Sequence, residues 1–215
     1  MKRMSPLGAL TQGLVAGLFG ALAQEVFFAL TKRVAPEPAT EVFEPPEAAQ
    51  YQETTTQTIA RRVVEALAQR GPLQHEAAAG ELVHYAFGGA WGGAYGIAAG
   101  TLPSLVSLRA GALFGLGVWA VSDNVMLPLF RLSAWPQDYP VKTHAYAICA
   151  HAVYGAATAA SFAALSRYRP AIMATLGAAL LARRLPKPVR PAARRLAARG
   201  LRASLRARAA APWLN

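Results

Sequence analysis

The chain has 215 residues, of which 54% are hydrophobic and only 15% are charged. Soluble domains usually carry about a quarter charged residues, so this composition argues against a soluble enzyme and for a membrane protein. The single cysteine, Cys149, excludes an internal disulfide and a cysteine-based zinc site, and its apolar neighbours predict a buried thiol.

Charge is concentrated at one end of the chain. Twelve of the 22 Lys and Arg residues, and none of the 11 Asp and Glu residues, lie from Arg167 onward. The net charge of +11 therefore belongs to the C-terminal segment. We predict a membrane domain over residues 1–165 and a basic, Arg-rich tail over residues 166–215.

Four apolar stretches have about the 20 residues that a helix needs to cross about 30 Å of hydrocarbon. A fifth apolar run, residues 171–182, is too short to span, so it either lies at the interface or extends the fourth helix. The sequence therefore predicts an all-α membrane protein with a four-helix transmembrane bundle. The predicted spans cover residues 7–30, 81–102, 110–130 and 144–165.

A polar loop, residues 31–80, separates the first two spans. Its Pro- and Glu-rich first part is expected to be extended. The stretch "TTTQTIARRVVEALAQRG" (54–71) places Ile59, Val63, Ala66 and Leu67 on one face, which predicts a short amphipathic helix. The Lys and Arg residues beside the spans, Lys2, Arg3, Arg109, Arg167 and Arg169, predict cytoplasmic N- and C-termini and place this loop outside.

Glycines recur at helical spacing in three of the spans, where they allow close backbone contact between helices. The stripes predict packing within the bundle or an interface with another subunit. They consist of Gly13, Gly17 and Gly20, then Gly89, Gly93, Gly96 and Gly100, then Gly111 and Gly115.

Six polar residues interrupt the predicted spans. A charged carboxylate at the centre of a bilayer costs about 2.5–3.5 kcal/mol on insertion scales, so these groups need partners or water. Three interpretations remain open: a structural hydrogen-bond network, a proton or ion pathway, and haem or metal ligation by His84 with His144 or His151. The six residues are Glu25, His84, Asp123, Asn124, His144 and His151.

The tail has its own pattern. Arg195, Arg199, Arg202 and Arg206 form a basic stripe on a helix expected after Pro191. Such a stripe is typical of contact with anionic lipid headgroups. A solvated tail or an acidic protein partner are alternatives, and nucleic acid is unlikely because no nucleic-acid-binding fold is recognisable.

The sequence contains no phosphate-binding Gly-rich loop, nucleophile elbow, HExxH motif or Cys pair, so we predict no enzyme activity and no cofactor. Three motifs, "HYAFGGAWGGAYG" (84–96), "GLGVWAVSDNVMLPLF" (115–130) and "YPVKTHAYAICAHAVYG" (139–155), resemble the YagU-like family of uncharacterised bacterial inner-membrane proteins. The resemblance covers roughly residues 7–165. It implies a multi-pass inner-membrane protein with polar positions at His84, Asp123, His144 and His151, and no assigned reaction.

The favoured hypothesis for function is a non-enzymatic structural or accessory subunit of a membrane assembly, with other membrane subunits or itself as partner. The first alternative is a small proton or ion channel or transporter that uses the intramembrane His, Asp and Glu residues. The second is a haem- or metal-binding membrane protein.

Overall fold

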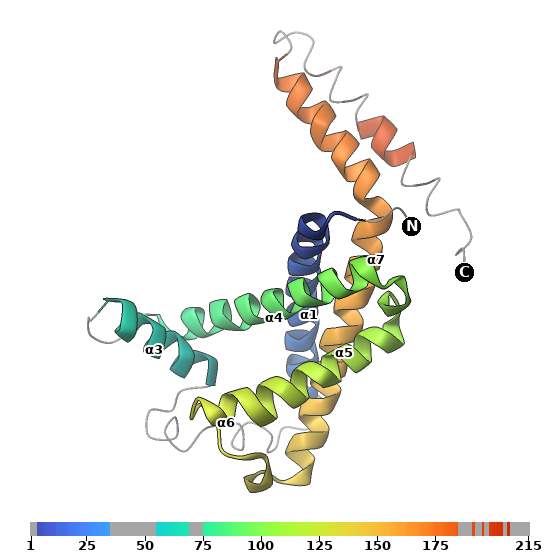
Figure 1. The fold of residues 1–215 in the computed structure, drawn as a ribbon. Helices are drawn as coiled ribbons and strands as arrows, with labels where there is room; N and C mark the ends of the chain where they lie inside the picture. Colours follow the sequence, from blue (N-terminus) through green and yellow to red (C-terminus); the bar gives the residue numbers. More distant parts are fainter. Residues whose placement is uncertain are drawn as a thin grey trace. The chain divides into compact units, whose positions relative to one another are not determined.

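The computed structural model describes residues 4–34, 55–68 and 75–184, together with Pro191, Arg195, residues 198–203 and Arg206. All regular secondary structure in these residues is helical, as predicted (Figure 1). The chain divides into two compact units, residues 1–162 and 163–215, and the bundle described below belongs to the first.

The bundle of the first unit consists of α1 (Pro6–Val34), α4 (Glu76–Thr101), α5 (Leu108–Val121) and the first part of α7 (Val141–Arg184), which continues into the second unit. The other described helical segments of this unit are α3 (Thr55–Ala68), two 3-10 turns (Pro103–Leu105 and Pro136–Asp138), a π-helical turn (Ser122–Met126) and α6 (Leu127–Leu129).

Local signals set the helix ends. Ser5 Oγ accepts a hydrogen bond from the Gly8 amide at 3.2 Å, and Ser107 Oγ accepts one from the Ala110 amide at 3.2 Å. Serine is among the preferred N-cap residues because its hydroxyl accepts from one of the amides left free in the first turn. Pro103 directly follows the end of α4, where it prevents the helix from continuing.

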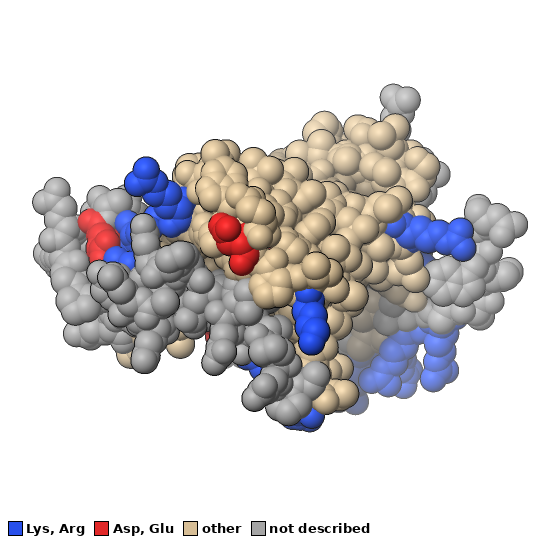
Figure 2. Space-filling view, turned by 90° about the horizontal axis from the view of Figure 1, so that it is seen from below, with Lys and Arg blue, Asp and Glu red and all other residues tan. Residues whose placement is uncertain are grey.

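Three of the described helical segments are long and apolar enough to cross a membrane: Pro6–Val34, Leu108–Leu129 and Val141–Tyr168. At most 33% of the most apolar window of each is buried within the protein. The remaining apolar surface faces outward, as lipid requires. Figure 2 shows one face on which charged side chains are few across a broad area. These features indicate a membrane protein.

The fourth predicted span, residues 81–102, corresponds to α4, which is helical over 26 residues. Seven of these are Gly, which lowers the mean hydropathy, and α4 is not among the three segments above. Four spans therefore stay a prediction. The apolar run 171–182 lies within α7 and so extends the fourth helix, and the short helix expected within residues 54–71 is α3. Cys149 is exposed, contrary to expectation, because it does not lie on the packed face of α7.

Glycines bring the backbones of α1 and α4 into direct contact. A Cβ atom placed on Gly13 would lie 2.7 Å from Gly96 Cα, and one placed on Gly17 would lie 2.7 Å from Gly92 Cα. No side chain fits between backbones at this distance. Since higher numbers on α1 meet lower numbers on α4, the two helices run antiparallel.

Similar contacts join α7 to α5 and to α1. A Cβ on Gly155 would lie 2.6 Å from the Gly115 amide nitrogen, and one on Gly20 would lie 2.8 Å from the Tyr154 carbonyl oxygen. Gln12 Nε2 donates to the Phe162 carbonyl oxygen at 2.8 Å. The order of these contacts makes α7 antiparallel to both helices, so α1, α4, α5 and α7 alternate in direction.

The glycine face of α4 differs from the predicted stripe. Gly88, Gly92 and Gly96 contact α1 most closely, and Gly100 lies against Ala9. Gly89 and Gly93 lie to one side of this contact, beside leucine side chains of α1. The sequence contains two Gly pairs, 88–89 and 92–93. The predicted stripe named Gly89 and Gly93, whereas Gly88 and Gly92 make the closer contacts with α1.

We predict that Gly92→Ala destabilises the bundle by about 1–3 kcal/mol, because a methyl group there overpacks two backbones. The added Cβ would lie 2.6 Å from the Gly17 amide nitrogen. Gly89→Ala is the matched control, because its Cβ would make ordinary contact with the Leu18 side chain at 3.4 Å. Thermal unfolding of both variants in mild detergent checks this, and equal midpoints would contradict it.

Candidate functional site

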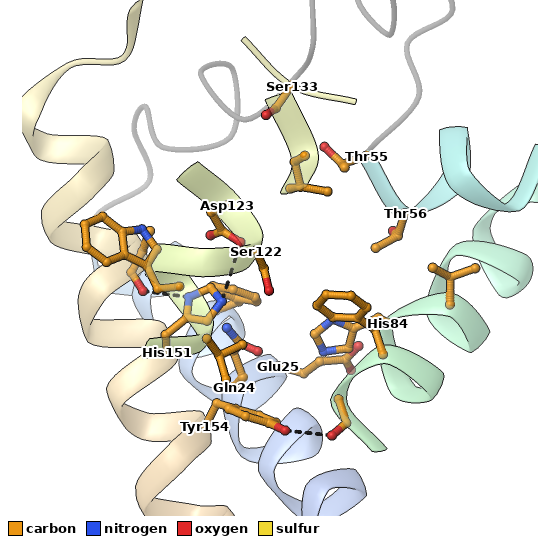
Figure 3. Close-up of a pocket in the computed structure, with 18 of the residues that line it drawn as sticks. Gln24, Glu25, Thr55, Thr56, His84, Ser122, Asp123, Ser133, His151 and Tyr154 are labelled. Atoms are coloured by element: carbon orange, nitrogen blue, oxygen red, sulfur yellow. Dashed lines mark hydrogen bonds and ion pairs between the residues drawn. The ribbon is translucent and has the colours of Figure 1, made fainter. Parts of the chain in front are cut away.

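A cavity of about 720 Å³ lies within the first unit. Its walls come from the C-terminal half of α1, the N-terminal half of α4, the end of α5 with the π-helical turn, and the start of α7. Thr55 and Thr56 of α3 also line it (Figure 3). Small-molecule sites typically occupy about 300–1,000 Å³, so this cavity is large enough for a small solute.

All six polar residues singled out in the sequence line this cavity, although they come from four separate segments of the chain. They are Glu25 on α1, His84 on α4, Asp123 and Asn124 in the π-helical turn, and His144 and His151 on α7. They do not form one continuous network. Among the described residues, no hydrogen bond or ion pair joins Glu25 or His84 to Asp123 or His151.

A first cluster of polar side chains, Glu25, His84 and Tyr85, lies between α1 and α4. The Tyr85 hydroxyl donates to Glu25 Oε2 at 3.1 Å. His84 Nε2 lies 3.5 Å from the Ala21 carbonyl oxygen, one turn before Glu25, which is at the long limit for a hydrogen bond.

A second cluster of polar side chains, which includes Asp123 and His151, lies between the end of α5 and α7. His151 Nδ1 lies 2.9 Å from the Ala147 carbonyl oxygen, which can only accept, so Nδ1 carries a proton and donates. His151 Nε2 lies 3.7 Å from Asp123 Oδ1 (Figure 3). This separation is too long for a direct hydrogen bond, so both atoms can bind a third group placed between them.

The π-helical turn places Asp123 on this wall. Pro128 has no amide hydrogen, and its ring would clash with the carbonyl group four residues earlier in a regular α-helix. The turn widens here, and the Leu127 amide donates to the Ser122 carbonyl five residues back. Asn124 Nδ2 donates to the Trp119 carbonyl oxygen at 3.0 Å. The amide of Asn124 therefore supports the turn itself.

His144 also has a local structural contact. Its Nε2 lies 2.9 Å from the Pro136 carbonyl oxygen and donates to it. The ring contacts Trp119 and Tyr139 edge-on, with centroids 6.1 and 6.4 Å away. His144 thus joins the connection before α7 to the helix.

Three residues that the sequence analysis did not select also line the cavity: Gln24, Ser122 and Tyr154. Gln24 and Ser122 are buried. Ser122 Oγ has no hydrogen-bond partner among the described residues. The Tyr154 hydroxyl donates to the Gly88 carbonyl at 2.6 Å. Ser122 could have been selected from the sequence, because it begins a run of three polar residues in an otherwise apolar helix.

The cavity wall carries an excess of acidic side chains. Among the described residues, Glu25, Glu81 and Asp123 line it, and Lys32 is the only Lys or Arg that does so. Within the described chain, none of the three carboxylates forms an ion pair with Lys or Arg. No group of three or more His, Cys, Asp or Glu side chains able to hold a metal ion occurs among the described residues.

Arg62 connects α3 to the turn that follows α6. Arg62 donates to the carbonyl oxygens of Phe130 and Arg131, at 3.0 and 3.3 Å. These carbonyls follow α6, where Arg131 has a positive φ of 54°. The Leu132 amide donates to the Leu127 carbonyl and the Arg131 amide to the Pro128 carbonyl, which is a Schellman helix end.

The four arginines of the predicted basic stripe, Arg195, Arg199, Arg202 and Arg206, are each helical and exposed within the second unit.

The family model described as "Protein of unknown function (DUF1440)" matches residues 37–178, and the chain therefore belongs to this family. The match begins after α1 and includes every cavity residue on α3, α4, α5 and α7. No curated protein and no solved structure matches the chain, so the YagU-like designation stays a prediction.

We predict that Arg62→Ala loosens α3 and lowers stability by about 1 kcal/mol, because two charge-assisted hydrogen bonds at a partly exposed site are lost. Glu65→Ala is the matched control, since Glu65 is exposed and forms an ion pair with Arg61 one turn earlier on the same helix. Thermal unfolding and limited proteolysis within residues 55–75 check this. Faster cleavage in the Glu65→Ala variant than in the Arg62→Ala variant would contradict the role of Arg62.

Proposed function

We propose that this member of a family without an assigned function is a four-span membrane transporter for small cations, protons among them. The observation that supports this most strongly is the convergence on one cavity of all six polar residues from otherwise apolar helices. Ionisable residues within membrane helices typically mark ion or substrate pathways. The sequence analysis favoured an accessory subunit, and the cavity now favours the transporter alternative.

Antiparallel packing supports a fourth span at α4. Its contacts with α1 run from Ala9 against Gly100 to Ala21 against Gly88. A helix held this closely along a membrane-spanning neighbour has to cross the same layer. Its glycines lower the mean hydropathy, but they also bury one face against α1, so that less of α4 needs to face lipid.

The position of the cavity favours a carrier over an open channel. All of its lining residues lie toward the end of the bundle that holds α3. Toward the other end, α1 packs directly against α4, and α5 packs directly against α7, through glycines. The cavity is thus a one-sided binding chamber, and passage of a solute requires the helices to separate at the glycine contacts.

We place the protein in the bacterial inner membrane with both termini in the cytoplasm. Four spans bring both termini to the same side, and the Lys and Arg residues beside the spans favour the cytoplasm. In this orientation the cavity and α3 face the outside. The exposed arginine stripe of the second unit then meets anionic lipid headgroups of the inner leaflet.

An accessory subunit without enzyme activity is the second candidate. Large exposed apolar side chains along α1, such as Phe19 at 52% exposure, could contact a partner subunit, although lipid contact accounts for them equally well. Stoichiometric co-purification of another membrane protein in mild detergent would favour this candidate.

Proteoliposomes that enclose a pH-sensitive dye provide the first test of transport. We expect the full chain to accelerate proton entry after an external acid pulse. Asp123→Asn and His151→Ala should each reduce the rate at least about tenfold, because each removes an ionisable group that lines the cavity. Asp138→Asn is the matched control, since Asp138 does not line the cavity.

A wild-type rate no faster than that of empty liposomes would contradict proton transport. Equal loss in the Asp138→Asn variant would show that loss of any carboxylate in this half of the chain damages the protein, and the cavity would then have no special role.

The second test concerns the tail. In nanodiscs with anionic lipid we expect slower chymotryptic cleavage of the tail than in neutral nanodiscs, because each Lys or Arg near the surface contributes about 1 kcal/mol. Replacing Arg195, Arg199, Arg202 and Arg206 by Gln should remove this protection, whereas replacing all four by Lys should keep it. Protection that is equal in neutral and anionic nanodiscs would contradict lipid binding.

A further inference from the structure

We infer that Ser122, Asp123 and His151 form a binding site for a primary ammonium group, so that the solute taken up by the cavity is a small organic amine in its protonated form. This inference rests on the proposed role of the cavity in binding a cation, and it names the chemical class of that cation. Three observations support it: the unpartnered hydroxyl of Ser122, the gap between Asp123 and His151, and the aromatic walls.

Ser122 provides the first observation. The residue is 1% exposed, lines the cavity, and its Oγ has no hydrogen-bond partner among the described residues. A buried hydroxyl without a partner costs about 1–3 kcal/mol, so such groups usually meet a water molecule or a ligand. The π-helical turn keeps Ser122 beside Asp123, and Figure 3 shows both side chains at the same wall.

The second observation is the gap between Asp123 and His151. Because His151 Nδ1 donates to the Ala147 carbonyl, the Nε2 of a neutral His151 carries a lone pair and can accept. Asp123 Oδ1 is also an acceptor, and the two atoms are 3.7 Å apart. Together with Ser122 Oγ they offer three acceptors. A primary ammonium group has three N–H donors and matches this number, whereas a quaternary ammonium has none.

Charge and wall composition fit the same ligand. Asp123 and Glu25 line the cavity and form no ion pair with Lys or Arg within the described chain, so a bound cation would meet acidic groups that no Lys or Arg neutralises. Trp91, Trp119 and Tyr154 line the same cavity and can enclose the apolar part of an amine. Aromatic faces also attract cations.

The probe is phenethylammonium, with 2-phenylethanol and phenethyltrimethylammonium as controls that share its ring and chain. Binding to the full chain in nanodiscs is measured by calorimetry and by fluorescence of Trp91 and Trp119. We expect saturable binding of phenethylammonium, and binding at least about tenfold weaker for both controls, because neither offers a charged N–H donor.

Variants locate the site. Asp123→Asn should weaken binding at least about tenfold, because it removes the negative charge that faces the ammonium group. Ser122→Ala should weaken binding several-fold, because it removes an acceptor. Asp138→Asn should bind like the wild type. Thermal unfolding establishes that each variant is folded, and Ser122→Ala keeps the test valid if the Asp123 variant does not fold.

Three results would overturn the inference. One is no saturable binding of phenethylammonium, the second is equal binding of the quaternary control, and the third is wild-type binding in folded Asp123→Asn or Ser122→Ala. These results are separate from the liposome test. Ammonium binding without proton flux would contradict the proposed proton transport and support the ammonium site. Proton flux without ammonium binding would support transport and contradict the ammonium site.

Discussion

The direct backbone contact between α1 and α4 is the constraint on which the rest of the bundle depends. Gly13 and Gly17 meet Gly92 and Gly96 with no side chain between them, and Gly155 meets Gly115 in the same way between α7 and α5. In lipid, helix association depends on such close packing because there is no hydrophobic gain from leaving the solvent. The cavity lies toward one end of the same helices, where Phe87, Trp119 and Tyr146 are among the side chains that line it.

A second constraint acts at one turn of helix. Pro128 cannot continue the regular hydrogen-bond pattern of α5, and the chain responds with a π-helical turn over Ser122–Met126. Ser122 and Asp123 consequently share the cavity wall, while Asn124 satisfies the Trp119 carbonyl. Short π-helical turns are often found at functional sites, because they hold side chains in positions that a regular helix does not offer. The turn beside Pro128 thus adds Ser122 and Asp123 to the polar groups that α1, α4 and α7 bring to the cavity.

The sequence predicted the parts of this arrangement that depend on composition and on local signals. Long apolar stretches and the amphipathic pattern within residues 54–71 predicted the helices. His84, Asp123 and His151 were recognisable because their neighbours are apolar. The register between helices could not be predicted, since Gly88–Gly89 and Gly92–Gly93 offer two equally good stripes and only the contact with α1 selects one. The π-helical turn could not be predicted from the sequence either, because one widened turn hardly changes the periodicity of an apolar helix. Gln24 and Ser122 were missed because a neutral polar residue gives a weaker signal than a charged one.

The division of the polar residues into two unconnected groups bears on their role. A purely structural network would be expected to join hydrogen-bonding groups to one another across helices, as Tyr85 does with Glu25. Asp123 and His151 instead face each other at 3.7 Å without a hydrogen bond, and Ser122 has no partner among the described residues. Leaving such groups unsatisfied in a membrane helix is costly. The cost is removed if the chamber admits water or a cation, because either can bond to all three groups at once. The contacts of His144 and Asn124 thus support the structure, whereas the arrangement of Ser122, Asp123 and His151 agrees with the binding role that we propose for the cavity.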